Sequence, residues 1–211
     1  FEGEQAEFNF RLFSGVRDWN LKADLDHYPG SNHKLKFGVN YIFHTFTPYT
    51  ASGSAGDVDF STDSLNKKIA YEGAIYFQDE FSIGPRVKIN MGVRANYFQQ
   101  RGPWNQIVYD GFGIAQDTIR HGKGESIKTY WGIEPRVSAR FLIDNNSSLK
   151  AGFTMNNQYI HLVSSSTSTL PTDLWVPSSA LVEPQKGIQY SIGYFRNFKE
   201  NMFETSIELY Y

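Results

Sequence analysis

Residues 19–43, WNLKADLDHYPGSNHKLKFGVNYIF, alternate apolar and polar side chains on both sides of a short turn. The odd positions of 19–25 are apolar and the even positions of 20–26 are polar or charged, and after the turn the odd positions of 35–43 are again apolar. Alternation of this kind places the apolar side chains on one face of a β-strand. Residues 29–32, PGSN, have the chemistry of a tight turn. The stretch therefore predicts a β-hairpin.

The same alternation returns along the rest of the chain and predicts about eight strands. Each of them pairs antiparallel with its neighbour in sequence, which gives an all-β fold of strands in up-and-down order. The predicted strands lie near residues 7–28, 33–46, 67–82, 86–99, 126–143, 148–163, 186–198 and 202–211.

The composition excludes several classes of protein. The chain has 20 Lys and Arg residues against 22 Asp and Glu residues, a net charge of −2, so it has no basic field to hold nucleic acid. The absence of cysteine excludes disulfides and thiolate metal sites, and no apolar stretch approaches the roughly 18 residues of a membrane-spanning helix. The histidines lack HxH and HExxH spacing and no nucleophile motif is present, so we predict no enzymatic activity, no metal site and no cofactor.

The connections between the predicted strands alternate between short turns and long polar segments near residues 47–65, 100–125 and 164–185. This asymmetry is typical of transmembrane β-barrels, whose two rims face different compartments. The predicted strands are also longer than the roughly five to six residues typical of globular sheets. We therefore expect a transmembrane sheet with lipid on its apolar face and aromatic residues at the membrane interfaces. The aromatic residues near the strand ends are Trp19, Tyr97, Trp131, Tyr159, Tyr194 and Tyr211.

Residues 131–141 read WGIEPRVSARF, and residues 146–151 read NSSLKA. Five further strings are NHKLKFG at 32–38, HTFTP at 44–48, NQYIHL at 157–162, PTDLWVPS at 171–178 and GYFRNFK at 193–199. In this order, these strings resemble the barrel of TonB-dependent outer-membrane receptors of the Bacteroidota. The resemblance covers most of the chain, from about residue 19 onward.

The resemblance implies a barrel of about 22 strands around a plug domain, and active import of a scarce nutrient such as a glycan, a peptide or a metal chelate. It implies as partners the plug and the remaining barrel strands, the TonB complex acting through the plug, and outer-membrane lipid, with a surface lipoprotein as a further candidate. We find neither a plug nor a TonB-contacting motif in the sequence. We therefore expect residues 1–211 to be an internal barrel segment, without a plug domain, in the bacterial outer membrane.

A second interpretation stays open, because eight is also a permitted strand number for a closed membrane barrel. The chain would then be a complete small outer-membrane barrel that serves as a surface binding or structural protein. The two interpretations differ in whether the first and the last strand pair with each other. We expect the first strand, near 19–28, and the last, near 202–211, to lie apart.

Two groups of side chains are candidates for a functional site. Aromatic and acidic residues in the long loops can grip a sugar, peptide or chelate, and they can equally pack the loops against each other. These loop residues are Trp104, Tyr109, Phe112, Asp173 and Trp175. Charged residues at even positions of neighbouring strands should face the lumen, where they either pair with one another or hold the plug. They are Lys88, Arg94, Glu134, Arg136, Arg140 and Lys150.

Overall fold

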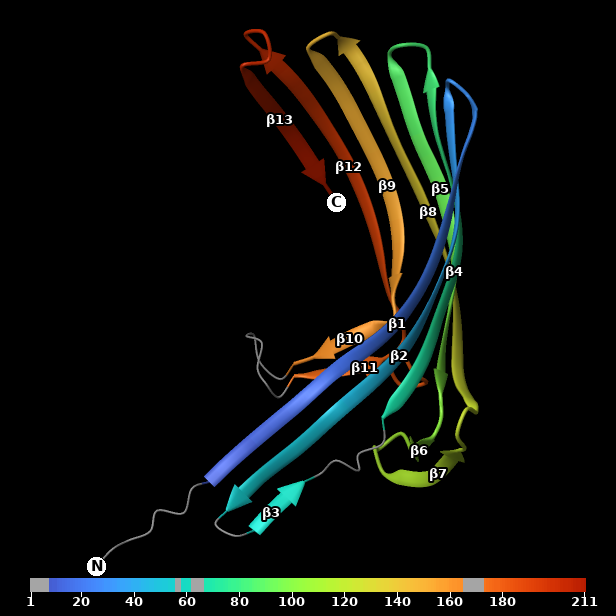
Figure 1. The fold of residues 1–211 in the computed structure, drawn as a ribbon, viewed down its shortest axis with the longest axis vertical. Helices are drawn as coiled ribbons and strands as arrows, with labels where there is room; N and C mark the ends of the chain where they lie inside the picture. Colours follow the sequence, from blue (N-terminus) through green and yellow to red (C-terminus); the bar gives the residue numbers. More distant parts are fainter. Residues whose placement is uncertain (1–7, 56–57, 62–66, 165–172) are drawn as a thin grey trace, which may run out of the picture.

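A computed structural model describes residues 8–55, 58–61, 67–164 and 173–211. Most of these residues form one curved antiparallel sheet in which each long strand pairs with its sequence neighbours (Figure 1). The eight strands of its main path are, in spatial order, β1 (Phe8–Gly30), β2 (His33–Ala55), β4 (Lys68–Ile83), β5 (Val87–Arg101), β8 (Ser126–Asp144), β9 (Ser147–Gln158), β12 (Gln185–Phe198) and β13 (Phe203–Tyr210). The predicted all-β, up-and-down architecture is confirmed.

The segments expected to be long loops contain strands of their own. β3 (Val58–Ser61) pairs with the far end of β2 and is the ninth strand of the main sheet, off its eight-stranded path. Two separate hairpins are formed by β6 (Trp104–Tyr109) with β7 (Ala115–His121), and by β10 (Ile160–Val163) with β11 (Leu174–Pro177). The short turns of the four main hairpins lie together at the upper end of the sheet in Figure 1, and the small hairpins lie at the opposite end.

The register keeps side chains of one kind on one face. Leu25 lies opposite Phe37, Phe37 opposite Phe77, and Phe77 opposite Val93, so one row of odd positions is apolar across four strands. These side chains are exposed on the convex face, as is Ile75, with 63% of its surface accessible. An exposed apolar surface this extensive is typical of a face that contacts an apolar environment. This agrees with the prediction that the apolar face of the sheet contacts lipid.

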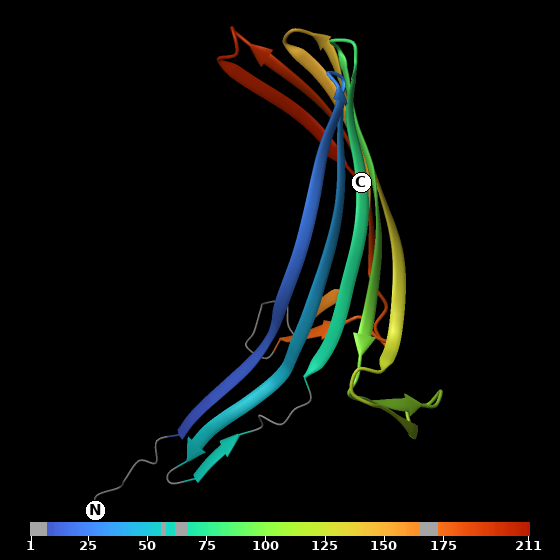
Figure 2. The same cartoon turned by 45° about the vertical axis from the view of Figure 1, so that its right-hand side comes forward.

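The main sheet is open. Its strand order begins at β1 and ends at β13, and in the described part of the chain no backbone pairing joins these two strands. The two views in Figures 1 and 2 show a curved wall whose first and last strands lie at different edges. The expectation that the first and last strands do not meet is confirmed, and the closed eight-stranded barrel finds no support in this sheet.

Candidate functional site

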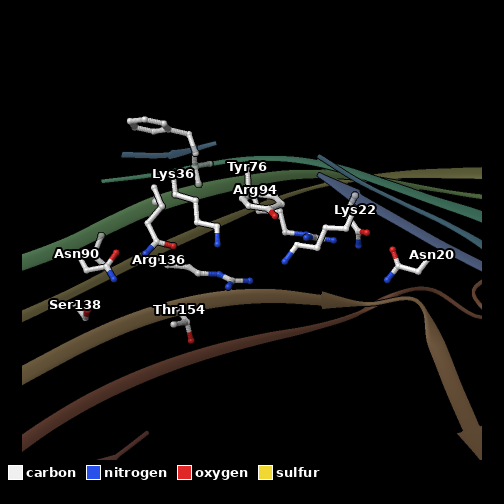
Figure 3. A pocket seen from close by; sticks show the side chains of 15 residues that line it. Asn20, Lys22, Lys36, Tyr76, Asn90, Arg94, Arg136, Ser138 and Thr154 are labelled. Carbon is white, nitrogen blue, oxygen red and sulfur yellow. The ribbon is translucent and has the colours of Figure 1, made fainter. Parts of the chain in front are cut away.

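The concave face of the sheet carries polar and charged side chains around a hollow of about 680 Å³. They come from even positions of β1, β2, β4, β5 and β8 and from Thr154 of β9, as the alternation predicts. Figure 3 shows their charged ends projecting into one space. The labelled residues are Asn20, Lys22, Lys36, Tyr76, Asn90, Arg94, Arg136, Ser138 and Thr154.

One edge of the hollow is organised around a glycine. Gly38 lies directly opposite Asp24 on β1 and Tyr76 on β4, and a Cβ at Gly38 would lie 2.1 Å from the Tyr76 ring. The missing side chain lets Tyr76 lie across β2 and donate its hydroxyl hydrogen to Asp24. The Asp24 carboxylate also lies 3.2 Å from the Lys22 ammonium and 3.8 Å from that of Lys36. Three strands are therefore tied together by one carboxylate.

A continuous series of acidic and basic side chains, which we call the charge chain, runs across the concave face: Asp18, His44, Glu72, Arg94, Glu134 and Arg136. His44, which is 1% exposed, has its Nδ1 2.8 Å from Asp18 and its Nε2 3.7 Å from Glu72. Arg94 then lies 3.6 Å from Glu72 and 3.8 Å from Glu134, and Arg136 lies 3.4 Å from Glu134. Acids and basic side chains alternate along this series, so each carboxylate lies beside an Arg or beside His44, which adds a positive charge only when it is protonated.

Glu134 is the most heavily bonded member of the charge chain. It is 4% exposed, and its Oε1 accepts hydrogen bonds from the Asn96 side chain at 2.7 Å and from the Asn157 backbone N–H at 2.8 Å. Tyr159 in turn donates its hydroxyl hydrogen to Asn96 Oδ1 at 2.6 Å. We call Asn96, Glu134 and Tyr159 the anchor.

The anchor depends on a second glycine. Gly132 lies directly opposite Asn96, and a Cβ there would lie 2.3 Å from Asn96 Oδ1 and 2.9 Å from the Tyr159 hydroxyl. The side-chain amide of Asn157 would be 2.5 Å away. No ordinary Cβ contact is this short, so any larger residue at this position must displace the anchor.

The anchor holds the hairpin β10–β11 across the concave face. The Tyr159 ring stacks on Phe98 with centroids 4.9 Å apart, and both belong to a buried cluster with Phe46 and Ala70. Strands β4, β5 and β8 separate β9 from β2 in the sheet, yet β11 contacts both β2 and β1. The hairpin must therefore cross the inside of the curve, where Figure 1 shows it beside the lower part of β1.

This arrangement corrects one prediction and reveals residues that the sequence analysis missed. Tyr159 was expected in an interfacial girdle at the end of a strand spanning 148–163, which is wrong: the strand ends at Gln158 and Tyr159 is buried inside. The reason is that its hydroxyl and its ring both find partners on the concave face. The sequence contained one signal of this burial. Aromatic residues stand next to each other at 97–98 and at 130–131, so the sheet is apolar on both faces at these strand ends.

The structure separates the predicted lumen residues into two groups. Arg94, Glu134 and Arg136 come together in the charge chain. The other three, Lys88, Arg140 and Lys150, lie on the same face near the short turns and line a second hollow of about 370 Å³.

The predicted loop residues lie on two different hairpins. Trp104 begins β6, and the ammonium of Lys68 lies 4.3 Å from its ring centroid. Tyr109 ends β6, and its side chain lies outside what the structure describes. Asp173 is buried beside β11, where Trp175 keeps 38% of its surface accessible.

Phe112 sits at the tip of the β6–β7 hairpin with 93% of its surface accessible. Asp110 organises this tip, because its Oδ1 accepts the backbone N–H groups of Phe112 and Ile114, each at 2.9 Å. These bonds to the ionised carboxylate, that of Ile114 first, hold the pKa of Asp110 below its usual value. The tip is therefore a shaped turn that presents an aromatic ring to its surroundings.

Comparison with known proteins adds to this geometry. A family model described as "TonB dependent receptor-like, beta-barrel" matches residues 2–211. Among solved structures, the chain is similar to the copper transporter OprC, with 16% identity and a TM-score of 0.62, over 93% of this chain and 30% of that one. It is also similar to the closed form of the ferric-catecholate import receptor Fiu from E. coli K12, with 15% identity and a TM-score of 0.52, over 93% and 31% of the two chains.

The chain therefore spans about a third of the length of these two proteins, and at such identities the likeness concerns the fold alone. No curated protein matches the chain in sequence. Within the described residues, no helix is long and apolar enough to cross a membrane.

Proposed function

Because residues 2–211 belong to the TonB-dependent receptor β-barrel family, we propose that this chain is part of the barrel of a transporter that imports a scarce nutrient. Barrels of this family lie in the bacterial outer membrane. The observation that carries the proposal is the open, curved wall itself, with paired charges on its concave face and exposed apolar side chains on its convex face. Such a wall suits an aqueous lumen on one side and lipid on the other.

We propose that further strands of the same receptor complete the barrel to about 22 strands. Support comes from the edges: β1 and β13 each have a pairing partner on one side only in the described part of the chain. Unpaired backbone groups cannot face hydrocarbon, so neighbouring strands must cover these edges in a membrane. The gentle curvature in Figures 1 and 2 agrees with a wide barrel.

The proposed cargo is a glycan, a peptide or a metal chelate. The two similar solved proteins are named for copper and for ferric catecholates, which makes the metal-bearing class the first to test. Trp104, Tyr109, Phe112, Asp173 and Trp175 are proposed to contact it. The accessible rings of Phe112 and Trp175 and the inward position of the β10–β11 hairpin support this assignment.

The proposed partners are the plug domain inside the barrel and the TonB complex acting through it. The charged concave face is the surface that the plug would meet. A surface lipoprotein at the long-loop end is a further proposed partner. The proposed role is transport and not catalysis. In support, the two similar solved proteins are named as a transporter and an import receptor.

The test is genetic and uses the full receptor. Deletion of its gene should abolish growth when one nutrient class, supplied as oligosaccharide, peptide or iron or copper chelate, is the sole source. A strain without TonB should show the same defect, and the intact receptor gene should restore growth in the deletion strain only. Normal growth of the deletion strain on every class, or uptake that continues without TonB, would overturn the proposal.

Intact mass of the native polypeptide separates the two architectures. A receptor with a plug and about 22 strands must be several times heavier than the 24.1 kDa of this chain. A native mass near 24.1 kDa would instead support the small surface barrel.

A further inference from the structure

Aromatic side chains gather on the convex face, on the side of the sheet toward the long loops. Trp19 lies opposite Phe43, and Phe43 lies opposite Tyr71. In the neighbouring row Tyr97 lies opposite Trp131, and their ring centroids are 5.3 Å apart. We call these five residues the aromatic band. Exposed Trp and Tyr rings on the outer face of a transmembrane sheet mark the level at which the membrane meets water.

The convex face becomes polar again toward the short turns. Asp79 occupies an odd position of β4, and its Oδ2 lies 2.9 Å from His33 Nδ1. The odd positions of 73–77 carry no charge. The stretch of β4 from Tyr71 to Asp79 therefore has the length of about nine residues that a tilted membrane strand needs. Because long loops of such barrels are extracellular, the aromatic band lies at the outer leaflet.

Two arginines lie on the convex face one row beyond the aromatic band. Arg17 on β1 is opposite Thr45, Thr45 is opposite Ile69, and Ile69 is opposite Arg101 on β5. We call Arg17 and Arg101 the arginine pair. Their backbones are separated by three strand spacings, about 14 Å, and lie about 7 Å along the strands from the row of Trp19. A headgroup layer is about 5–8 Å deep on each side of the hydrocarbon, so the arginine pair lies at its level.

The side chains of the arginine pair have donors to spare. Arg17 is exposed, and in the described part of the chain its guanidinium makes neither a hydrogen bond nor an ion pair. The Arg101 guanidinium lies 5.1 Å from the centroid of the Tyr71 ring. It donates from Nε to Gln99 Oε1 and from Nη1 to the carbonyl oxygen of Gly124, each at 2.8 Å. Both acceptors are neutral, so these bonds orient the guanidinium and leave its charge in place.

The acids next to the arginine pair face other partners. Asp18 follows Arg17 in the sequence but points to the concave face, where its Oδ1 lies 2.8 Å from His44. Glu125 lies in the loop that Arg101 contacts, and its Oε2 accepts the backbone N–H of Gly122 at 2.7 Å. Among the described residues, no carboxylate forms an ion pair with either arginine. The convex face therefore keeps two positive charges just outside its apolar surface.

We propose that the arginine pair binds the phosphate groups of a lipid in the outer leaflet, while the aromatic band lies against the region where its acyl chains begin. The planar fork of N–H donors on a guanidinium matches phosphate oxygens. Lipid phosphates already lie at this level of a membrane, whereas an acidic protein would have to displace lipid to reach the convex face. The proposal goes beyond the proposed function, because it requires the membrane position of the barrel but no particular cargo.

The test is native mass spectrometry of the full receptor, purified in dodecyl maltoside and titrated with lipid A that carries two phosphates. Arg17→Gln combined with Arg101→Gln should weaken binding about 25-fold, because each basic side chain near an anionic lipid surface contributes about fivefold. Lipid A stripped of both phosphates should bind equally to the wild type and to this variant. The matched control is Arg86→Gln with Lys199→Gln, which removes two exposed charges at the short turns and should bind as the wild type does.

Heat-modifiable gel mobility checks that each variant folds. Arg17→Gln alone, which removes no hydrogen bond within the described residues, should weaken binding about fivefold and keeps the test decisive if the double variant does not fold. Unchanged binding by the folded arginine variants, or an equal loss in the control, would overturn the proposal. So would displacement of the lipid by millimolar inorganic phosphate, which would indicate a site for free anions.

The growth test of the proposed function is independent of this readout. A receptor that supports no nutrient-dependent growth but binds the phosphorylated lipid through the arginine pair would remove the proposed function alone. Growth that depends on TonB, together with lipid binding that ignores the arginine pair, would remove this inference alone.

Discussion

Substitution of Gly132 by alanine tests whether the anchor stabilises the wall. The new Cβ would lie 2.3 Å from Asn96 Oδ1, 2.5 Å from the Asn157 amide and 2.9 Å from the Tyr159 hydroxyl, so these groups must move apart. The Tyr159–Asn96 hydrogen bond is worth about 1 kcal/mol, and each bond to the Glu134 carboxylate about 1.5–3 kcal/mol. Loss of the first bond and weakening of the others predicts a destabilisation of about 2–4 kcal/mol.

The assay is urea unfolding of the purified full receptor in detergent, followed by tryptophan fluorescence. The matched control is Gly187→Ala on β12, because nothing lies within 4 Å of a Cβ at that position; its free energy of unfolding should change by no more than about 0.5 kcal/mol. Tyr159→Phe should cost about 1 kcal/mol alone and less in the Gly132→Ala background, where the bond is already broken. Equal unfolding free energies for the Gly132 and Gly187 variants would refute the reasoning.

Three further predictions use the same receptor. Gly38→Ala should lower the unfolding free energy by about 1–3 kcal/mol because its Cβ meets the Tyr76 ring, and a cost that persists in a Tyr76→Ala background would contradict this cause. Asp110→Ala should increase hydrogen exchange at the backbone amide of Phe112. In the wild type, protection of this amide should hold above the pKa of an unfolded Asp, about 4, and decline as pH falls through the lowered pKa of Asp110. Protection that does not depend on pH would exclude this role of Asp110. Phe112→Ser should leave the unfolding free energy within about 0.5 kcal/mol but reduce nutrient-dependent growth, and full growth would remove Phe112 from the proposed substrate contacts.

The main sheet could be predicted from the sequence because its two faces meet uniform and opposite surroundings. Every odd position of 35–43 is apolar, and each of these side chains lies on the convex face with its neighbours in the register. Turns such as 29–32 carry local turn chemistry, so the ends of the hairpins could also be located. The predicted lumen parity of Arg94 and Glu134 followed from the same alternation.

The inward hairpin could not be predicted, because its partners are distant in sequence. Tyr159 bonds to Asn96, 63 residues earlier, and no local pattern states which strand end lies beneath it. The need for Gly132 follows from that meeting and has no signal of its own. The sequence also could not separate the predicted lumen residues into two groups. Which charged side chains pair with each other depends on which residues lie opposite one another on neighbouring strands.

The hairpin β10–β11 links two parts of the curved sheet that are not neighbours in the strand order. It leaves the sheet at β9 and meets β1 and β2 on the far side of three intervening strands, so it spans the arc as a chord. A change in the curvature of the sheet would have to break the contacts of β11 with β1 and β2. The stacked rings of Tyr159 and Phe98 and the hydrogen bonds of the anchor hold the start of this hairpin against β5 and β8. The connection between β9 and β12 therefore adds contacts across the curve of the sheet to those that neighbouring strands make with each other.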